Sequence, residues 1–131
     1  MELPTRSYRI TRTDLVRYAG ASGDFNPIHW SDRIATSVGL PGVIAHGMFT
    51  MALVARAVTE WTGDPGAIVE YQVRFTRPIA VPDTDEGTEL TVSAVVKTTT
   101  PEGYQVLDLT AMCQGQKVLA QARATVRGTV G

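Results

Sequence analysis

A long apolar segment in the first half of the chain constrains the fold most. Residues 46–61 carry only two charged side chains, Arg56 and Glu60. The large apolar residues of this segment are Met48, Phe49, Met51, Leu53, Val54, Val58 and Trp61. Such a pattern predicts a helix that is apolar around most of its circumference, and helices of this kind are buried. At ~1.5 Å per residue the helix is about 24 Å long, enough to cross a small domain.

Glycine and proline at 63–66 end this helix, and the chain beyond them alternates between apolar and polar residues. Alternation with a period of two predicts strands with one buried face. The apolar positions of the four predicted strands are Val69, Tyr71, Val73 and Phe75; Leu90, Val92, Ala94 and Val96; Leu107, Leu109 and Ala111; and Val118, Ala120, Ala122, Ala124 and Val126. Turns are expected at 101–103 and 115–116, and a longer link at 78–87. These elements predict an α+β fold in which an antiparallel sheet wraps around one helix.

Two shorter helices are expected before the long one. Thr11 and Asp14 have the spacing of a capping box, which predicts a helix from about residue 12 to residue 20. Residues 21–28 contain glycine and an Asn-Pro pair and therefore predict an ordered loop. Ser31 is placed to cap a helical turn over residues 32–37, which Gly39 ends.

Size and composition limit the class of protein. A chain of 131 residues is expected to form a single domain, residues 1–131, with one core. Its formal charge is −1 and it has no run of like charges, so no nucleic-acid-binding tail is indicated. The single cysteine, Cys113, excludes an intrachain disulfide and is expected in the core. With no signal-like start and no apolar run of ~18 residues, a cytoplasmic protein without a membrane partner is expected.

The loop at 21–29 holds the first candidates for catalysis. Asp24 and His29 are five residues apart, and the corner at Asn26 and Pro27 folds the loop so that both side chains can face one point. An imidazole, with an ordinary pKa of ~6.5, takes or gives a proton at neutral pH, while an aspartate accepts hydrogen bonds from a water molecule. The alternative is a structural Asx-type loop with a histidine on the surface.

The start of the long helix holds the second set of candidates, His46 and Gly47. Backbone N–H groups at a helix start lack partners within the helix and can bind an oxygen on which negative charge develops. Gly47 has no side chain to block such an approach. Alternatively, Gly47 serves only close packing against the sheet. For His46 a structural role at the helix end is the favoured interpretation, which leaves it a weak candidate for catalysis.

Other chemistries find less support in the sequence. No glycine-rich loop for a dinucleotide or a phosphate is present, so no cofactor is expected. A metal ion would have to use Asp24, His29 and His46, which lack the two-histidine helical spacing of zincins, so no metal is expected either. Ser22 and Ser31 lie near His29, yet neither stands in a nucleophile elbow.

Two motifs carry a resemblance to a known family. Residues 18–29 read YAGASGDFNPIH and residues 44–48 read IAHGM. With weaker similarity around residues 70–78, they resemble the MaoC-like family of (R)-specific enoyl-thioester hydratases and dehydratases. The resemblance covers roughly residues 8–127. It implies the hot-dog fold, in which a long central helix is wrapped by a curved antiparallel sheet.

The resemblance also implies roles for individual residues. Asp24 and His29 would be the catalytic pair, Asn26 and Pro27 would position the loop, and the Gly47 N–H would polarise the thioester carbonyl. The implied reaction is the reversible hydration of a trans-2-enoyl thioester to a (3R)-hydroxyacyl thioester. The implied substrates are acyl-CoA or acyl carrier protein thioesters, without a cofactor. Acyl chain length, carrier and physiological direction stay open, as does which member of the pair handles the C2 proton.

Two positions depart from the family pattern. Many relatives have an acidic residue two positions after the histidine, where this chain has Ser31. Many single-chain hydratases have a serine eight residues after the helix glycine, in contact with the catalytic aspartate, where this chain has Ala55. The groups around the catalytic pair are therefore expected to differ from those of the family.

The resemblance extends to possible partners. Segments 26–30, 45–51 and 63–67 are most similar to the catalytic B subunit of the two-chain (3R)-hydroxyacyl-carrier-protein dehydratases of mycolic-acid-making bacteria. This similarity implies a heterodimer with a second hot-dog subunit that lacks the catalytic pair, and a homodimer is the simpler alternative. Two other functions remain open: a non-catalytic subunit that binds acyl thioesters, and a hot-dog thioesterase.

Overall fold

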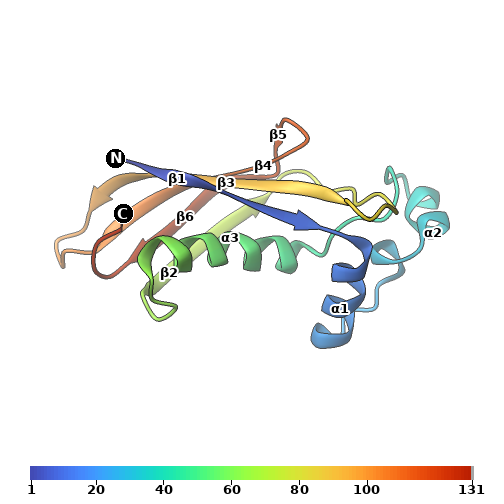
Figure 1. Cartoon of the computed structure of the whole chain (residues 1–131), viewed down its shortest axis with the longest axis horizontal. Coiled ribbons are helices and arrows are strands. Elements are labelled where there is room, and N and C mark those ends of the chain that lie inside the picture. The colour runs from blue at the N-terminus through green and yellow to red at the C-terminus, as the bar shows by residue number, and fades with distance from the viewer. Residues whose placement is uncertain (131) are drawn as a thin grey trace.

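One long helix lies along one face of a six-stranded antiparallel sheet in the computed structural model, which describes residues 1–130 (Figure 1). The last residue of the predicted domain, 131, lies outside the described residues. The strand order is β1-β3-β4-β6-β2, and the short β5 pairs with β4. The strands are β1 (Glu2–Ile10), β2 (Ile68–Phe75), β3 (Thr88–Thr99), β4 (Gln105–Cys113), β5 (Gln116–Lys117) and β6 (Leu119–Val126). The helices are α1 (Arg12–Ser22), η1 (Pro27–His29), α2 (Asp32–Ser37) and α3 (Gly47–Thr62).

The central helix α3 confirms the main prediction from the sequence to within one residue at each end. Its buried residues are Thr50, Leu53, Val54, Ala57, Val58 and Trp61, and most of them belong to the hydrophobic core shared with the sheet. Met48 is an exception, because it lies exposed in the first turn. At its C-terminus Gly63 adopts a left-handed conformation with φ of 72° and its N–H bonds to the Thr59 carbonyl, which ends the helix.

The first strand, β1, is an element that the sequence did not reveal. Leu3, Tyr8 and Ile10 point into the core, but the alternation is broken where the pairing with β3 shifts between Leu3 and Arg6. Pro4 lies inside this irregular stretch, as expected for a residue without an N–H in a sheet. Because β1 is an edge strand, a proline and a bulge are tolerated there.

The opposite edge is β2, and its predicted burial was partly wrong. Tyr71 and Val73 are half-buried against the core, but Val69 and Phe75 are exposed. The pairing of β2 with β6 shifts at two places, so strict alternation is not kept along the strand. Strand β2 pairs with β6 on one side and is the last strand of the sheet order.

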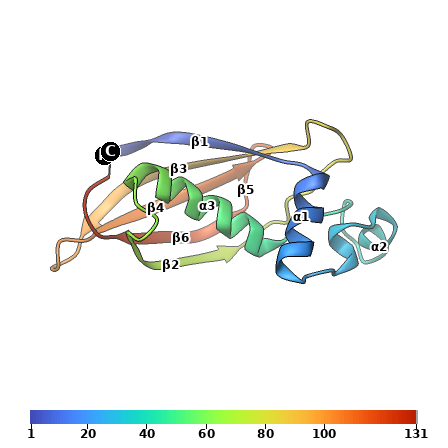
Figure 2. The ribbon, with the colours of Figure 1, turned by 60° about the horizontal axis from the view of Figure 1, so that its bottom comes forward.

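The two small helices gather at one end of the molecule, beside the start of α3 (Figure 2). The capping box at Thr11 and Asp14 is present, and α1 ends at Gly23, whose φ is 78°. The Ser31 hydroxyl accepts a hydrogen bond from the Ile34 N–H and caps α2 as predicted. The start of β1 and the end of β6 lie toward the far end of α3, away from this helical corner (Figure 2).

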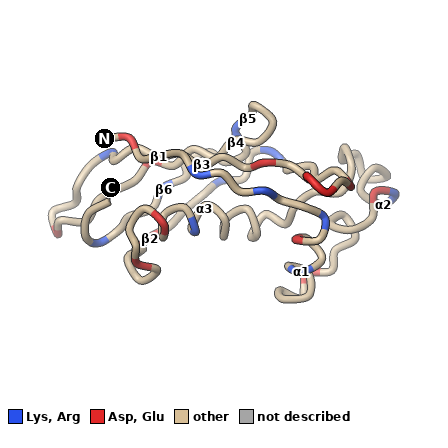
Figure 3. The backbone as a smooth tube through the Cα atoms, viewed as in Figure 1, with Lys and Arg blue, Asp and Glu red and all other residues tan. Residues whose placement is uncertain are grey.

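Charged residues are mixed over the molecule, with Lys and Arg interspersed among Asp and Glu (Figure 3). The first half of α3 carries no charge as far as Arg56. Cys113 is buried, as predicted. Within residues 1–130, no helix is long and apolar enough to cross a membrane.

Candidate active site

The loop after α1, the start of α3 and the end of β2 meet at one pocket of about 320 Å³. His29 and Gly47 line it together with Thr50 of α3. The rest of the wall is mostly apolar and is formed by Ile44, Ala45, Phe75, Pro78, Ile79 and Val118, with Arg77 as the charged member. An apolar cavity with a few polar groups gathered at one end is typical of a ligand site.

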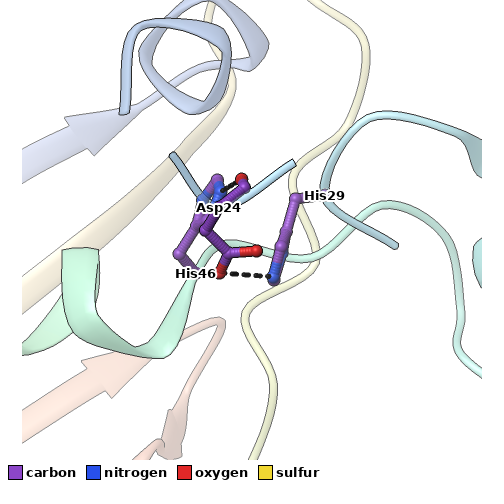
Figure 4. Close-up of side chains that lie close together, drawn as sticks. All are labelled: Asp24, His29 and His46. Atoms are coloured by element: carbon purple, nitrogen blue, oxygen red, sulfur yellow. Dashed lines mark hydrogen bonds and ion pairs between the residues drawn. The ribbon is translucent and has the colours of Figure 1, made fainter. Parts of the chain in front are cut away.

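His29 has one ring nitrogen fixed and the other available for chemistry. The ring is 8% exposed, and Nδ1 lies 2.7 Å from the Ile44 carbonyl oxygen. A carbonyl only accepts, so Nδ1 carries a proton and donates it, and Nε2 of the neutral ring keeps its lone pair. This lone pair lies on the side of Asp24, whose Oδ2 is 3.8 Å from Nε2 (Figure 4).

Asp24 is held in the loop through its backbone and one carboxylate oxygen. Oδ1 accepts a hydrogen bond from the Asn26 N–H at 3.2 Å, and the Asp24 N–H donates to the Ser22 hydroxyl. The other oxygen faces His29, and the Asp24 side chain is 50% exposed. Asp24 can therefore bind a water molecule or a substrate hydroxyl together with His29.

Asn26 and Pro27 shape the corner as the sequence predicted. The Asn26 side-chain oxygen accepts from the Ile28 N–H at 3.2 Å and caps the short helix η1, which Pro27 begins. Proline fits the first position of a helix because its missing N–H has no partner there. The turn brings His29 back toward Asp24, so the residues that the sequence proposed as a pair do lie together.

His46 lies against His29, at the helix end where the sequence favoured a structural role for it. It occupies the N-cap position of α3, but its side chain makes no capping hydrogen bond. Its ring stacks on the His29 ring with 3.9 Å between centroids and 21° between planes. Its Nε2 lies 3.1 Å from the Asp24 carbonyl oxygen. Burial lowers the pKa of His46, and the neighbouring His29 lowers it further.

Gly47 has a close neighbour on the sheet and a backbone N–H without an acceptor among the described residues, and its donor role stays a prediction. Within residues 1–130 the Gly47 N–H has no hydrogen-bond acceptor, as expected at the first position of a helix. A methyl group added at Gly47 would lie 3.3 Å from the ring of Phe75, which shows how closely β2 approaches the helix start. Gly47 thus lines the pocket, has an N–H without an acceptor among the described residues, and leaves space for the Phe75 ring.

The two histidines and Asp24 form a cluster whose ligand atoms lie within 4.8 Å of one another, but it does not fit a metal ion well. The lone pairs of stacked imidazoles lie in nearly parallel planes, so they do not converge on one point. One nitrogen of each ring also faces a carbonyl oxygen and must carry a proton there.

A second network, around Asp32, holds the segment that supplies the Ile44 carbonyl. Asp32 Oδ1 accepts from the Val43 N–H at 2.9 Å and from Arg12 Nη2 at 3.0 Å. These two contacts, the Val43 N–H first, lower the pKa of Asp32. The Ile44 N–H in turn donates to the Ile28 carbonyl, so the loop and this segment are tied together.

This network predicts a pH-dependent loss of stability in Asp32→Ala. A carboxylate with a lowered pKa in the folded state stabilises the protein above its unfolded pKa, and this stabilisation is lost as the pH falls through the folded pKa. Because Asp32 is more than half exposed, we expect a loss of about 0.5–1 kcal/mol at neutral pH. Urea unfolding at pH 7 and pH 3 measures it, and the difference in stability between the two proteins should be smaller at the lower pH.

Asp32→Asn is the matched control, because the amide oxygen can still accept from the Val43 N–H while the charge is lost. It should keep part of the stability at pH 7. A difference between Asp32→Ala and the wild type that stays constant from pH 7 to pH 3 would contradict the assignment.

Several residues of the site were not found from the sequence. Thr50, Phe75 and Arg77 line the pocket, and the Ile44 carbonyl orients His29. The position of Thr50 three residues after Gly47, on the same helix face, was an available signal. The sequence contains no signal that would identify the role of a backbone carbonyl such as that of Ile44. Ala55 cannot supply the hydroxyl of the family's serine. The Asp24 carboxylate accepts from the Asn26 N–H, and the Asp24 backbone carbonyl faces His46 Nε2.

A central helix in an antiparallel sheet, with an Asp–His pair at the helix start, defines a hot-dog protein of the hydratase type. The chain belongs to the family described as the MaoC like domain, whose model matches residues 2–111. The predicted family and fold are thereby confirmed.

Relatives with curated names are similar to most of the chain. The 3-hydroxyacyl-thioester dehydratase X of Mycobacterium tuberculosis is 39% identical over 102 residues, which cover 72% of this chain and 35% of the relative. The (R)-specific enoyl-CoA hydratase of Rhodospirillum rubrum is 31% identical over 118 residues, covering 89% and 78%. The chain therefore spans about a third of the mycobacterial relative and most of the other one.

Solved structures have the same fold as this chain. A MaoC-like dehydratase has a TM-score of 0.93 at 42% identity and covers 98% of this chain, which matches 40% of that chain. A chain of the ChsH1-ChsH2 complex from Mycobacterium tuberculosis has a TM-score of 0.79 at 23% identity, covering 97% and 96%. The second likeness shows the fold alone.

Proposed function

We propose that the protein catalyses the reversible addition of water to a trans-2-enoyl thioester, giving a (3R)-hydroxyacyl thioester. One observation carries this proposal: a carboxylate oxygen of Asp24 and the free Nε2 of His29 lie 3.8 Å apart, beside a pocket that Gly47 lines. A water molecule held by both side chains would stand next to a carbonyl bound at the helix start.

The reaction follows from these three groups. The Gly47 N–H binds the thioester carbonyl oxygen and stabilises the negative charge that develops there. Asp24 and His29 hold the water, the pair removes one proton as the oxygen bonds to C3, and the pair returns one proton to C2. The C2–C3 double bond becomes a single bond, and no electron acceptor is needed. Dehydration is the same path in reverse.

The substrate class rests on the relatives and on the pocket. The curated relatives are named as a 3-hydroxyacyl-thioester dehydratase and an (R)-specific enoyl-CoA hydratase. The apolar wall around Ile44, Phe75 and Val118 suits the acyl part of such a thioester. We therefore propose acyl-CoA or acyl carrier protein thioesters as substrates.

We further propose that a second hot-dog unit completes the site, either another copy of this chain or a different subunit. The edge strand β2 and the exposed Phe75 lie at the pocket, where a neighbour would cover them. The structural relative from Mycobacterium tuberculosis is itself part of a complex of two proteins. The more specific resemblance to a B subunit stays a prediction.

For the location we propose the cytoplasm. The single cysteine, Cys113, is a buried free thiol, and such a thiol is compatible with a reducing compartment. The enoyl and hydroxyacyl thioesters that we propose as substrates are bound to CoA or to a carrier protein. Fractionation of the native host followed by immunoblotting tests the location directly.

The first test measures water addition by the purified chain. We expect the absorbance of a short or a long trans-2-enoyl-CoA to fall on addition of the protein, and chromatography of the product to show the (3R)-hydroxyacyl-CoA. The oligomeric state of the same sample, from light scattering, shows whether a homodimer is the active species.

If the folded chain alone is inactive, co-expression with a second hot-dog subunit is the next measurement. Activity of the pair supports a heterodimer. Absence of turnover with CoA and carrier-protein thioesters in both forms would contradict the proposed function.

A further inference from the structure

The ring of His46 is enclosed between the catalytic loop and the start of α3. It is 1% exposed, stacks on His29 on one side and lies 4.8 Å from the Tyr18 ring, tilted by 57°. Tyr18 also contacts Phe49 of α3, so the imidazole belongs to a packed aromatic group rather than to the pocket wall. The residues that line the pocket do not include His46.

Its hydrogen bonds define one protonation state. Nε2 faces the Asp24 carbonyl oxygen at 3.1 Å, and because a carbonyl only accepts, Nε2 carries the proton. Nδ1 is buried and has no hydrogen-bond partner within residues 1–130. A proton on Nδ1 would leave a buried positive charge with an unsatisfied donor, which is costly. The ring is therefore neutral and has its proton on Nε2.

We propose that His46 is a positioning residue that acts in this neutral state, through a hydrogen bond to the Asp24 backbone and a stack on the His29 ring. This proposal rests on the proposed function, because it assigns the support of the same Asp–His pair. His46 fixes both members of the pair at once: the carbonyl of one and the ring plane of the other (Figure 4).

The neutral state of the His46 ring is part of its positioning role. The titratable groups that face the ring are His29, Asp24 and Tyr18. When His29 takes up a proton during the reaction, a second positive charge 3.9 Å away would oppose it, and a neutral ring does not. The lowered pKa of His46, caused by burial and by His29, agrees with this state.

Two substitutions of His46 separate the effect of its hydrogen bond to the Asp24 carbonyl from other effects. The amide nitrogen of Gln lies near the position of Nε2, whereas that of Asn lies near the position of Nδ1. His46→Gln can donate to the Asp24 carbonyl, and His46→Asn cannot reach it. We expect His46→Asn to lower kcat by about 10²-fold, since a displacement of about 1 Å costs that much, with KM within about threefold. His46→Gln should recover at least about tenfold of this loss.

A third variant tests the stack. His46→Phe keeps an aromatic ring against His29 but has no donor, so it should lose activity like His46→Asn. The pH dependence of kcat/KM should keep the wild-type shape in all three variants, because His46 transfers no proton. Equal losses in His46→Gln and His46→Asn, or a missing limb of the pH profile, would overturn the proposal in favour of direct proton transfer.

A measurement without turnover keeps this test separate from the proposed function. Two-bond ¹H–¹⁵N correlation spectra of the wild-type protein labelled in histidine report the tautomer of each ring. We expect His46 to remain the neutral Nε2–H form from pH 8 down to pH 5.5. A protonated His46 within this range would overturn the proposal even in an active enzyme. A neutral His46 in a protein that turns over no enoyl thioester would instead contradict the proposed function.

Discussion

His29→Asn is expected to lower kcat for water addition by about 10²- to 10⁴-fold, the usual contribution of general acid–base catalysis. Asn is chosen because its amide nitrogen lies near the position of Nδ1 and can still donate to the Ile44 carbonyl, 2.7 Å away in the native protein. The variant then lacks the free nitrogen that faces Asp24, together with the ring that stacks on His46. The decrease in enoyl-thioester absorbance under saturating substrate measures the effect.

Two further variants make this result specific. His29→Ala also leaves the Ile44 carbonyl without its donor, so it should lose stability as well as activity, whereas His29→Asn should unfold near the wild-type temperature. Asp24→Asn keeps an oxygen for the Asn26 N–H and removes only the charge, so it should be as inactive as His29→Asn. If a folded His29→Asn protein retained more than about a tenth of the wild-type kcat, His29 would not be the proton-transfer group.

The elements that the sequence predicted well are those whose signal is local. The capping pair Thr11 and Asp14 and the apolar pattern of 46–61 each lie within a few turns of the chain, and both helices were found. β1 was missed because Pro4 and the bulge interrupt its alternation, and what makes it a strand is its pairing with β3, some eighty residues away. Pairing of this kind is a tertiary effect that overrides a weak local pattern.

The same distinction holds at the site. Asp24 and His29 lie in one short loop, so the corner at Asn26 was enough to bring them together. The stack of His46 on His29 depends on distant contacts: the Ala45 N–H donates to the Ile79 carbonyl, and Ile44 forms a bridge to Ala80. No spacing within the first fifty residues encodes these contacts. The partners of His46 therefore required the structure.

The second large effect is expected at Gly47. Substitution of Gly47 by proline removes the backbone N–H without disrupting the helix that presents it. Proline is well suited to the first position of a helix, because the N–H that it lacks has no partner within the helix. The preceding residue, His46, already has φ of −61° and ψ of 133°, the extended geometry that a following proline requires. Gly47→Pro should therefore keep α3 intact while removing the proposed donor to the thioester carbonyl.

Gly47→Ala is the matched control, since it keeps the N–H and adds a methyl group 3.3 Å from the Phe75 ring. That ring is 49% exposed and can turn aside. We expect Gly47→Pro to lose about 10²- to 10³-fold in kcat, as for removal of an oxyanion donor, and Gly47→Ala less than about tenfold. Circular dichroism and thermal unfolding verify the fold of both variants. Equal losses in the two would mean that Gly47 provides space at the helix start rather than a hydrogen bond to the substrate.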